Sequence, residues 1–137
     1  MARYVATDNN ITINGSDFSS SIAAVTLNTT AEEVETSSFG NDWRSRVAGL
    51  KDASITLDFH QDFGASAVDA TLWPLLGSNA TVVVKPTSDA TGATNPAFSV
   101  VFVVTEYKPF ENSVGDLATL SISWPLASGS GITRGTA

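Results

Sequence analysis

Two segments of the sequence alternate apolar and polar residues with a period of two. In residues 53–60 the apolar members are Ile55, Leu57 and Phe59, and residues 118–124 repeat the pattern. Because successive side chains of a β-strand point to opposite faces, the alternation predicts two strands that are each buried on one side. The other side of these strands carries small or polar side chains: Ser54, Thr56, Asp58 and His60 on the first, and Thr119, Ser121 and Ser123 on the second.

Other parts of the chain also favour β-structure. Residues 81–85 and 98–108 are nearly continuous in Val and Phe, which is typical of strands buried on both faces or covered by a partner. Residues 22–27 and 33–36 are predicted to be two further strands, joined by a turn at residues 28–30 because Asn and Thr favour turns. The chain is therefore predicted to be largely β.

A single segment departs from this pattern. In residues 66–76 the apolar side chains, among them Val68 and Leu72, fall at helical spacing. Pro74 lacks an N–H group and clashes with the preceding turn, so the helix should end or kink near Trp73. We expect one short helix lying against a β core.

The connection over residues 37–52 combines apolar and aromatic residues with arginines. Long structureless connections are uncommon in compact domains unless they serve a function. Aromatic anchors beside arginines match the composition of interface centres, although the loop could instead fold back over its own core. We predict a subunit interface formed by Phe39, Trp43, Arg44, Arg46 and Leu50.

Composition and charge exclude several classes of protein. At 137 residues the chain fits one domain, and it contains no cysteine, which excludes disulfides and thiolate sites. A net charge of −7 argues against attraction to nucleic acid or anionic lipid. Charged residues make up only 15%, against about a quarter in typical soluble domains. Either Ser and Thr hydroxyls supply the solubility, or neighbouring subunits cover much of the surface.

Three features of the sequence bear on targeting and on order at the chain ends. The first residues carry no apolar core of a secretory signal, which favours synthesis in the cytoplasm. No stretch is apolar and long enough to predict a membrane span. The Ser- and Gly-rich residues after Pro125 cannot pack a core unaided, so they are predicted to be disordered or held by a neighbour.

Residues that could carry catalysis or bind a metal are few. His60, the only histidine, lies between Asp58 and Asp62, but strand neighbours on one face lie roughly 6 to 7 Å apart, too far for a compact zinc site. A triad with Ser66 would need a Gly-x-Ser-x-Gly turn, and residues 64–68 lack the second glycine. We predict no catalytic, cofactor or metal site and no enzyme activity.

A further signal lies in the order and spacing of five segments rather than in any single motif. They are residues 35–57, which include Phe39 and Trp43, and residues 59–63, 68–77, 104–110 and 114–119. Together they resemble the tail tube (major tail) proteins of long-tailed, siphovirus-type bacteriophages, especially those of actinobacterial hosts. The resemblance covers nearly the whole chain.

The resemblance implies a fold and a division of the chain. It implies an all-β class, a β-sandwich or half-barrel, with one flanking helix at about residues 66–76 and a long inter-strand loop at 37–52. A single tail-tube domain would span 1–137. An N-terminal arm would occupy 1–10, and a C-terminal tail at 126–137 would be flexible or become ordered on assembly.

The resemblance also implies partners and a location. Six copies would close into a ring, and rings would stack into a tube in the virion tail through which the genome passes into the host. A tape-measure protein, a tail terminator and baseplate or tip proteins would complete the tail. Basic residues lining the lumen would hold DNA phosphates. One of the two polar strand faces, which carry no Lys or Arg, would therefore line the lumen.

The sequence also fits two other kinds of protein. The inner tube of a contractile tail or injection machine shares the ring architecture. A secreted β-sandwich adhesin or carbohydrate-binding module would also be acidic and rich in Ser and Thr.

Overall fold

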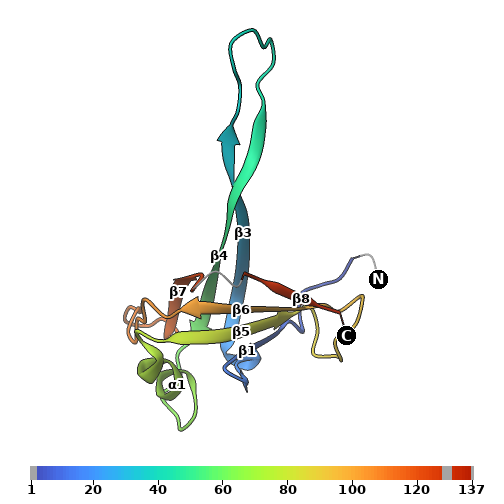
Figure 1. Cartoon of the computed structure of the whole chain (residues 1–137). Helices are drawn as coiled ribbons and strands as arrows, with labels where there is room; N and C mark the ends of the chain where they lie inside the picture. Colours follow the sequence, from blue (N-terminus) through green and yellow to red (C-terminus); the bar gives the residue numbers. More distant parts are fainter. Residues whose placement is uncertain (1–2, 128–130, 137) are drawn as a thin grey trace.

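The computed structural model describes residues 3–127 and 131–136. Its strands form two antiparallel sheets, in the orders β2-β1-β5-β6-β8 and β3-β4-β7 (Figure 1). The predicted all-β class with one short helix is confirmed. The elements are β1 (Asn10–Ile13), β2 (Ser16–Asp17), the 3-10 helix η1 (Ser19–Ser21), β3 (Ile22–Glu35), β4 (Arg46–His60), α1 (Val68–Leu75), β5 (Asn79–Lys85), β6 (Ala97–Val103), β7 (Thr119–Pro125) and β8 (Thr133–Gly135).

The core lies between the two sheets, where their inward-facing side chains meet. The three-stranded sheet contributes the alternating apolar residues of β4 and β7, as the period of two predicted. Trp124 is fully buried, and its Nε1–H group donates to Glu106 O at 3.1 Å. The buried side chains of the two sheets are Ala53, Ile55, Leu57, Phe59, Leu120, Ile122 and Trp124 on one, and Ile11, Ile13, Ala80, Val82, Val100 and Phe102 on the other.

Strand β3 is continuous where two strands and a turn were predicted, so the predicted turn at residues 28–30 is wrong. Asn28, Thr29 and Thr30 pair with Ser54, Ala53 and Asp52 of β4. Cross-strand pairing with a long partner outweighs the turn preference of Asn, and the β-branched Thr side chains suit a strand.

The loop predicted at 37–52 is shorter than expected, because β4 already begins at Arg46. Val47 pairs with Val34, and Lys51 pairs with Ala31, so both strands continue well beyond the sandwich. Figure 1 shows this part of the hairpin projecting from the body of the molecule. We call residues 29–52 the arm; every one of them is exposed.

The helix and the strand after it refine two further expectations. The predicted helix is confirmed as α1, which buries Val68 and Leu72 and contains Pro74 in its last turn. The strand predicted at 98–108 is too long, since β6 ends at Val103. Val104 still bonds the residues just before β5, with Val104 N donating to Ser78 O at 2.9 Å and Val104 O accepting from Gly77 N at 2.8 Å, and the strand pairing ends there.

The described part of the predicted C-terminal tail pairs with the five-stranded sheet. In β8, Thr133 and Arg134 lie opposite Ser99 and Phe98 of β6. Residues 1–2 of the predicted N-terminal arm and 128–130 and 137 of the predicted tail lie outside the described residues. Within the described ranges, the structure has no helix long and apolar enough to cross a membrane.

Candidate assembly surfaces

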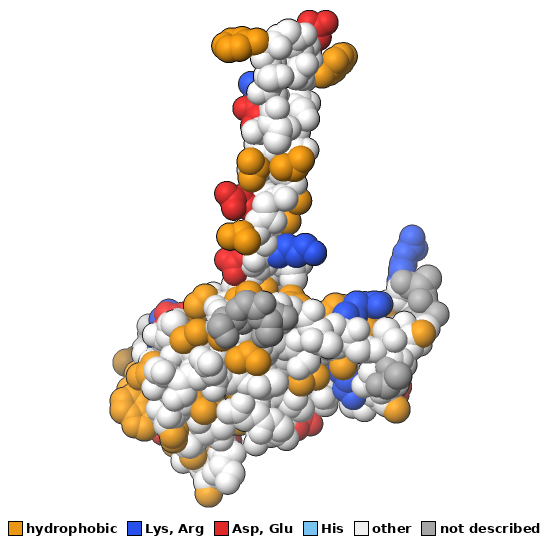
Figure 2. All heavy atoms as spheres, in the orientation of Figure 1, with side chains coloured by type: hydrophobic (Ala, Val, Ile, Leu, Met, Phe, Trp, Pro, Cys, Tyr) orange, Lys and Arg blue, Asp and Glu red, His pale blue; other side chains and the backbone are white. Residues whose placement is uncertain are grey.

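The free end of the arm carries exposed aromatic side chains. Phe39 and Trp43 lie in the turn between β3 and β4, with exposed fractions of 108% and 87%. Figure 2 shows hydrophobic side chains at this end, far from the body. Leu50, nearer the body, is also exposed, at 82%. The free end of the arm thus presents aromatic side chains that the other described residues leave uncovered.

Polar contacts shape the end of the arm. Thr36 N donates to Ser45 O at 2.7 Å, and Thr36 Oγ1 donates to Ser45 Oγ at 2.9 Å. Ser45 N also donates to Ser37 Oγ at 2.8 Å. These bonds close the turn, and none of the residues that make them is buried.

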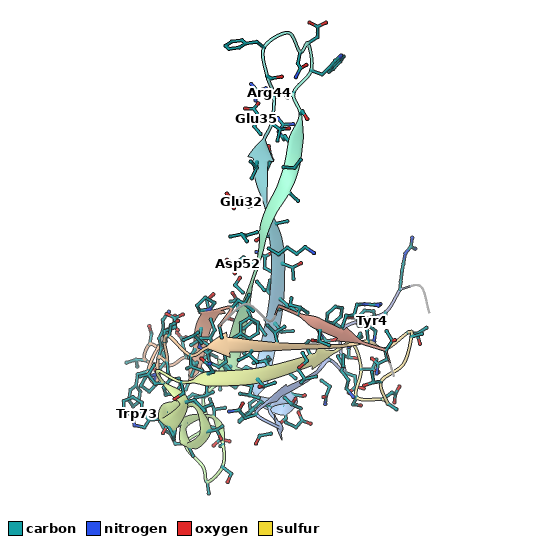
Figure 3. The ribbon with its side chains drawn as sticks, in the orientation of Figure 1. Tyr4, Glu32, Glu35, Arg44, Asp52 and Trp73 are labelled. Atoms are coloured by element: carbon teal, nitrogen blue, oxygen red, sulfur yellow. The ribbon has the colours of Figure 1, made fainter. Side chains whose placement is uncertain are left out.

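The two arginines of the predicted interface pair with carboxylates across the hairpin. Arg46 pairs with Glu33, and Arg44 Nε lies 3.8 Å from Glu35 Oε1; Figure 3 labels Arg44 and Glu35 near the end of the arm. All four side chains are largely exposed, and such pairs contribute only about 0–1 kcal/mol. The structure thus places the five predicted interface residues on one arm, where the two arginines form ion pairs across the hairpin.

The two candidate lumen faces are a single surface. β4 and β7 are paired so that Thr56 lies opposite Ser123 and His60 opposite Thr119. Thr56 Oγ1 lies 3.4 Å from Ser123 Oγ. All seven predicted residues, Ser54, Thr56, Asp58, His60, Thr119, Ser121 and Ser123, are half-buried or exposed on the side of this sheet away from the core.

Strand β3 extends this polar surface with residues that the sequence analysis did not assign to it. Thr26 lies opposite Thr56, and Asn28 lies opposite Ser54. The alternation of Val25 and Leu27, which pack against the core, could have identified them. None of the assigned positions on the three strands is Lys or Arg.

The chemistry available on this polar surface is limited. His60 Nδ1 is buried and has no hydrogen-bond partner among the described residues. Over residues 3–127 and 131–136, no three His, Cys, Asp or Glu side chains are grouped to hold a metal ion. The arrangement gives a neutral to acidic, hydroxyl-rich sheet face.

A second apolar surface lies at the α1 end of the body. The rings of Phe63 and Phe110 are 5.6 Å apart, and Trp73 lies 6.4 Å from the ring of Tyr107. Phe63, Trp73 and Phe110 are each more than half exposed. Figure 3 shows Trp73 at the end of the molecule opposite the arm. The exposed aromatic side chains therefore occur at both ends of the molecule.

A hydrogen-bond network supports the α1 end. Tyr107 Oη donates to Asp69 Oδ1 at 2.7 Å and accepts from Gln61 Nε2 at 3.0 Å. Burial, and then the bond to the Asp69 carboxylate, raise the pKa of Tyr107 to about 12. The network joins α1 to the segment after β6.

Comparison with known proteins identifies the fold. No protein-family model matches the sequence, and no curated protein matches it significantly. A chain of the virion of a native gene transfer agent particle is similar in structure, with a TM-score of 0.76 and 15% identity over 96% of this chain and 98% of that one. A chain from the tail of an empty gene transfer agent particle with C6 symmetry has a TM-score of 0.64 and 17% identity over 83% and 81%.

These likenesses define the class of fold to which the molecule belongs. The two-sheet body is shared with chains from a phage-like particle and from the tail of such a particle. The comparison therefore supports the resemblance to tail tube proteins at the level of the fold.

Proposed function

We propose that the protein is a structural subunit of a phage tail tube, assembled from stacked rings of identical copies. The observation that carries this proposal is the fold shared with a chain of a gene transfer agent tail. The C6 symmetry of that tail supports six copies in each ring. In this proposal the protein has no catalytic role and resides in the virion tail after synthesis in the host cytoplasm.

The arm is proposed to make the contact between copies. A two-stranded ribbon is at best marginally stable in water, and this one presents Phe39, Trp43 and Leu50 to solvent. Burial of aromatic side chains supplies most of the energy of many interfaces, so Trp43 is the expected anchor. Arg44 and Arg46 would hold the hairpin in the shape that the neighbour receives.

The position of the arm explains how a tube could grow. An arm at one end of the body that contacts a different surface of a copy in the next ring makes a heterologous interface, which extends indefinitely because stacking along the tube axis does not close on itself. Other proteins must then set the length. A tape-measure protein, a tail terminator and baseplate or tip proteins are the partners proposed for this role.

The polar sheet face is proposed to line the bore. It is rich in hydroxyl groups and carries no Lys or Arg at its assigned positions, so it offers DNA phosphates no cation to hold them. The net charge of −7 points the same way. Genome passage without specific binding would follow.

The segments at the ends of the chain and the type of tail complete the proposal. Residues 1–10 and 126–137 are proposed to contact neighbouring copies, with Thr133–Gly135 keeping its pairing with β6 of the same chain. The sequence resemblance favours a long, non-contractile, siphovirus-type tail of an actinobacterial phage. A sheath around the same tube in the particle would instead identify the inner tube of a contractile tail.

Negative-stain electron microscopy of the concentrated, purified protein tests the proposal. Hollow tubes are expected from the unaltered protein and from Trp43→Phe, which keeps an aromatic anchor. Trp43→Ala should remain a folded monomer. Tubes of normal length and number from Trp43→Ala would refute the role of the arm, and a protein that stays monomeric at every concentration would contradict the function.

A further inference from the structure

Two N–H groups on the outer edge of β7 are already bonded. Ser123 N donates to Glu106 Oε1 at 2.8 Å, and Ser121 N donates to Glu111 Oε2 at 3.0 Å. Since β4 pairs along the other side of β7, these bonds lie on the edge that a further strand would join. An edge strand with unpaired groups is a template for another chain. Here the carboxylates of Glu106 and Glu111 accept the hydrogen bonds that the carbonyl groups of such a strand would accept.

The backbone that carries the carboxylates is anchored independently of them. Glu106 O accepts the indole N–H of the fully buried Trp124, and Tyr107, the next residue, is also buried. Glu111 is exposed, with Lys108 Nζ 4.0 Å from its Oε1. Rotation of the two carboxylates would therefore free the N–H groups of Ser121 and Ser123 without breaking the bond between Trp124 and Glu106 O.

We propose that Glu106 and Glu111 guard the β7 edge of the free subunit and block its premature pairing with a second copy of the chain. A carboxylate accepts a stronger hydrogen bond from N–H than a carbonyl group does, so the guard competes well with the first contact of an incoming strand. A full strand offers several bonds and side-chain contacts together. The guard thus raises the concentration needed for association and still permits assembly.

The partner surface is the other free edge of the same sheet, which belongs to β3. Both β3 and β7 run antiparallel to β4, so they run in the same direction. In copies related by rotation about a tube axis, the β3 edge of one copy would meet the β7 edge of the next as a parallel neighbour. This choice of partner rests on the proposed function, whereas the guard itself rests on the hydrogen bonds.

Removal of both carboxylates tests the guard. Sedimentation velocity of Glu106→Ala/Glu111→Ala should show association beginning at a concentration about tenfold lower than in the control, as expected from two modest hydrogen bonds. The control is Asp89→Ala/Asp116→Ala, which removes the same charge from exposed positions whose side chains make no hydrogen bond among the described residues. In dilute monomer, amide exchange at Ser121 and Ser123 should be faster in the guard variant.

A threshold equal to or above that of the control would overturn the proposal. If the alanine variant does not fold, the association threshold of Glu106→Gln/Glu111→Gln tests the proposal instead. This variant keeps an acceptor oxygen at each position and loses only the charge. Its threshold must then fall below that of Asp89→Asn/Asp116→Asn, and equality refutes the guard. Early association of the guard variant without tubes from the unaltered protein would support the guard and refute the tube function. Normal tubes from the unaltered protein, with a guard variant whose association threshold equals that of the control, would support the tube function and refute the guard.

Discussion

Strand β4 lies in two different environments along its length. In residues 53–60 every second side chain is buried in the sandwich, whereas residues 46–52 are exposed throughout. Both parts pair with the same partner, β3. The body is therefore held by apolar burial, and the arm is held by backbone pairing and polar contacts, with its apolar side chains exposed. In the proposed function, a neighbouring copy would supply the layer that the arm lacks.

The largest expected effect on folding is at the core. Trp124→Ala removes a fully buried indole and its bond to Glu106 O, so the free energy of unfolding should fall by about 3–5 kcal/mol. Urea unfolding followed by circular dichroism measures it. A loss below about 1 kcal/mol would show that the body does not depend on this packing.

The matching change in the arm should affect assembly and not folding. Trp43→Ala should alter the free energy of unfolding by less than about 0.5 kcal/mol, because the side chain is 87% exposed. The same variant should fail to form tubes. Strong destabilisation in urea unfolding would remove the distinction between arm and body.

The hydroxyl of Tyr107 should have an intermediate effect on stability. Tyr107→Phe removes the bonds to Asp69 and from Gln61, which should cost about 1 kcal/mol. The raised pKa also predicts a pH dependence. Above pH 10 the phenol ionises in the unfolded chain first, so its contribution is complete below the unfolded pKa and is lost as the pH rises through about 12.

Unfolding curves of the unaltered protein and Tyr107→Phe between pH 8 and about 12 check this prediction. The difference between the two proteins should shrink as the pH rises. A constant difference would contradict the assigned cause of the pKa shift.

Gly49 offers a finer test of the shape of the arm. A Cβ atom there would lie 3.1 Å from Val34 Cγ2 and 3.2 Å from Glu32 Cβ, so Gly49→Val should distort the hairpin locally. We expect fewer tubes and an unchanged unfolding midpoint for the body. Gly92→Val, at a loop position with open space around it, is the control. Equal tube yields from both variants would show that arm geometry is not critical.

The smallest effect is expected at the ion pair of the arm. Arg46→Gln loses the pair with Glu33, which is exposed and worth at most about 1 kcal/mol. Unfolding should be unchanged within error. A salt-dependent loss of stability would show that the arm contributes to folding of the body.

The sequence predicted the parts of the molecule that a core covers. The alternation around Leu57 and Ile122 predicted residues 53–60 of β4 and the strand β7, and the spacing of Val68 and Leu72 predicted α1. Local patterns failed where long-range pairing decides. The type of residue at position 28 favours a turn, but Asn28 pairs with Ser54 of β4 and so lies in a strand. The two polar faces form one surface because β4 and β7 are paired, and the sequence does not show that pairing.

The predicted assembly residues depended on a different signal. Phe39 and Trp43 were selected by composition, and the structure adds that they are exposed at the end of a projecting hairpin. The guard on β7 could not be predicted, because Glu106 and Glu111 meet Ser123 and Ser121 only once the chain has folded back along the edge.

A cryo-electron microscopy map of tubes grown from the purified protein would show where the arm and the polar sheet face lie in the assembly. We expect Phe39 and Trp43 to be buried against a neighbouring copy and the face carrying Thr56, Asp58 and Ser123 to line the bore. Arms that project freely into solvent, or a bore lined mainly by Lys and Arg, would contradict this expectation.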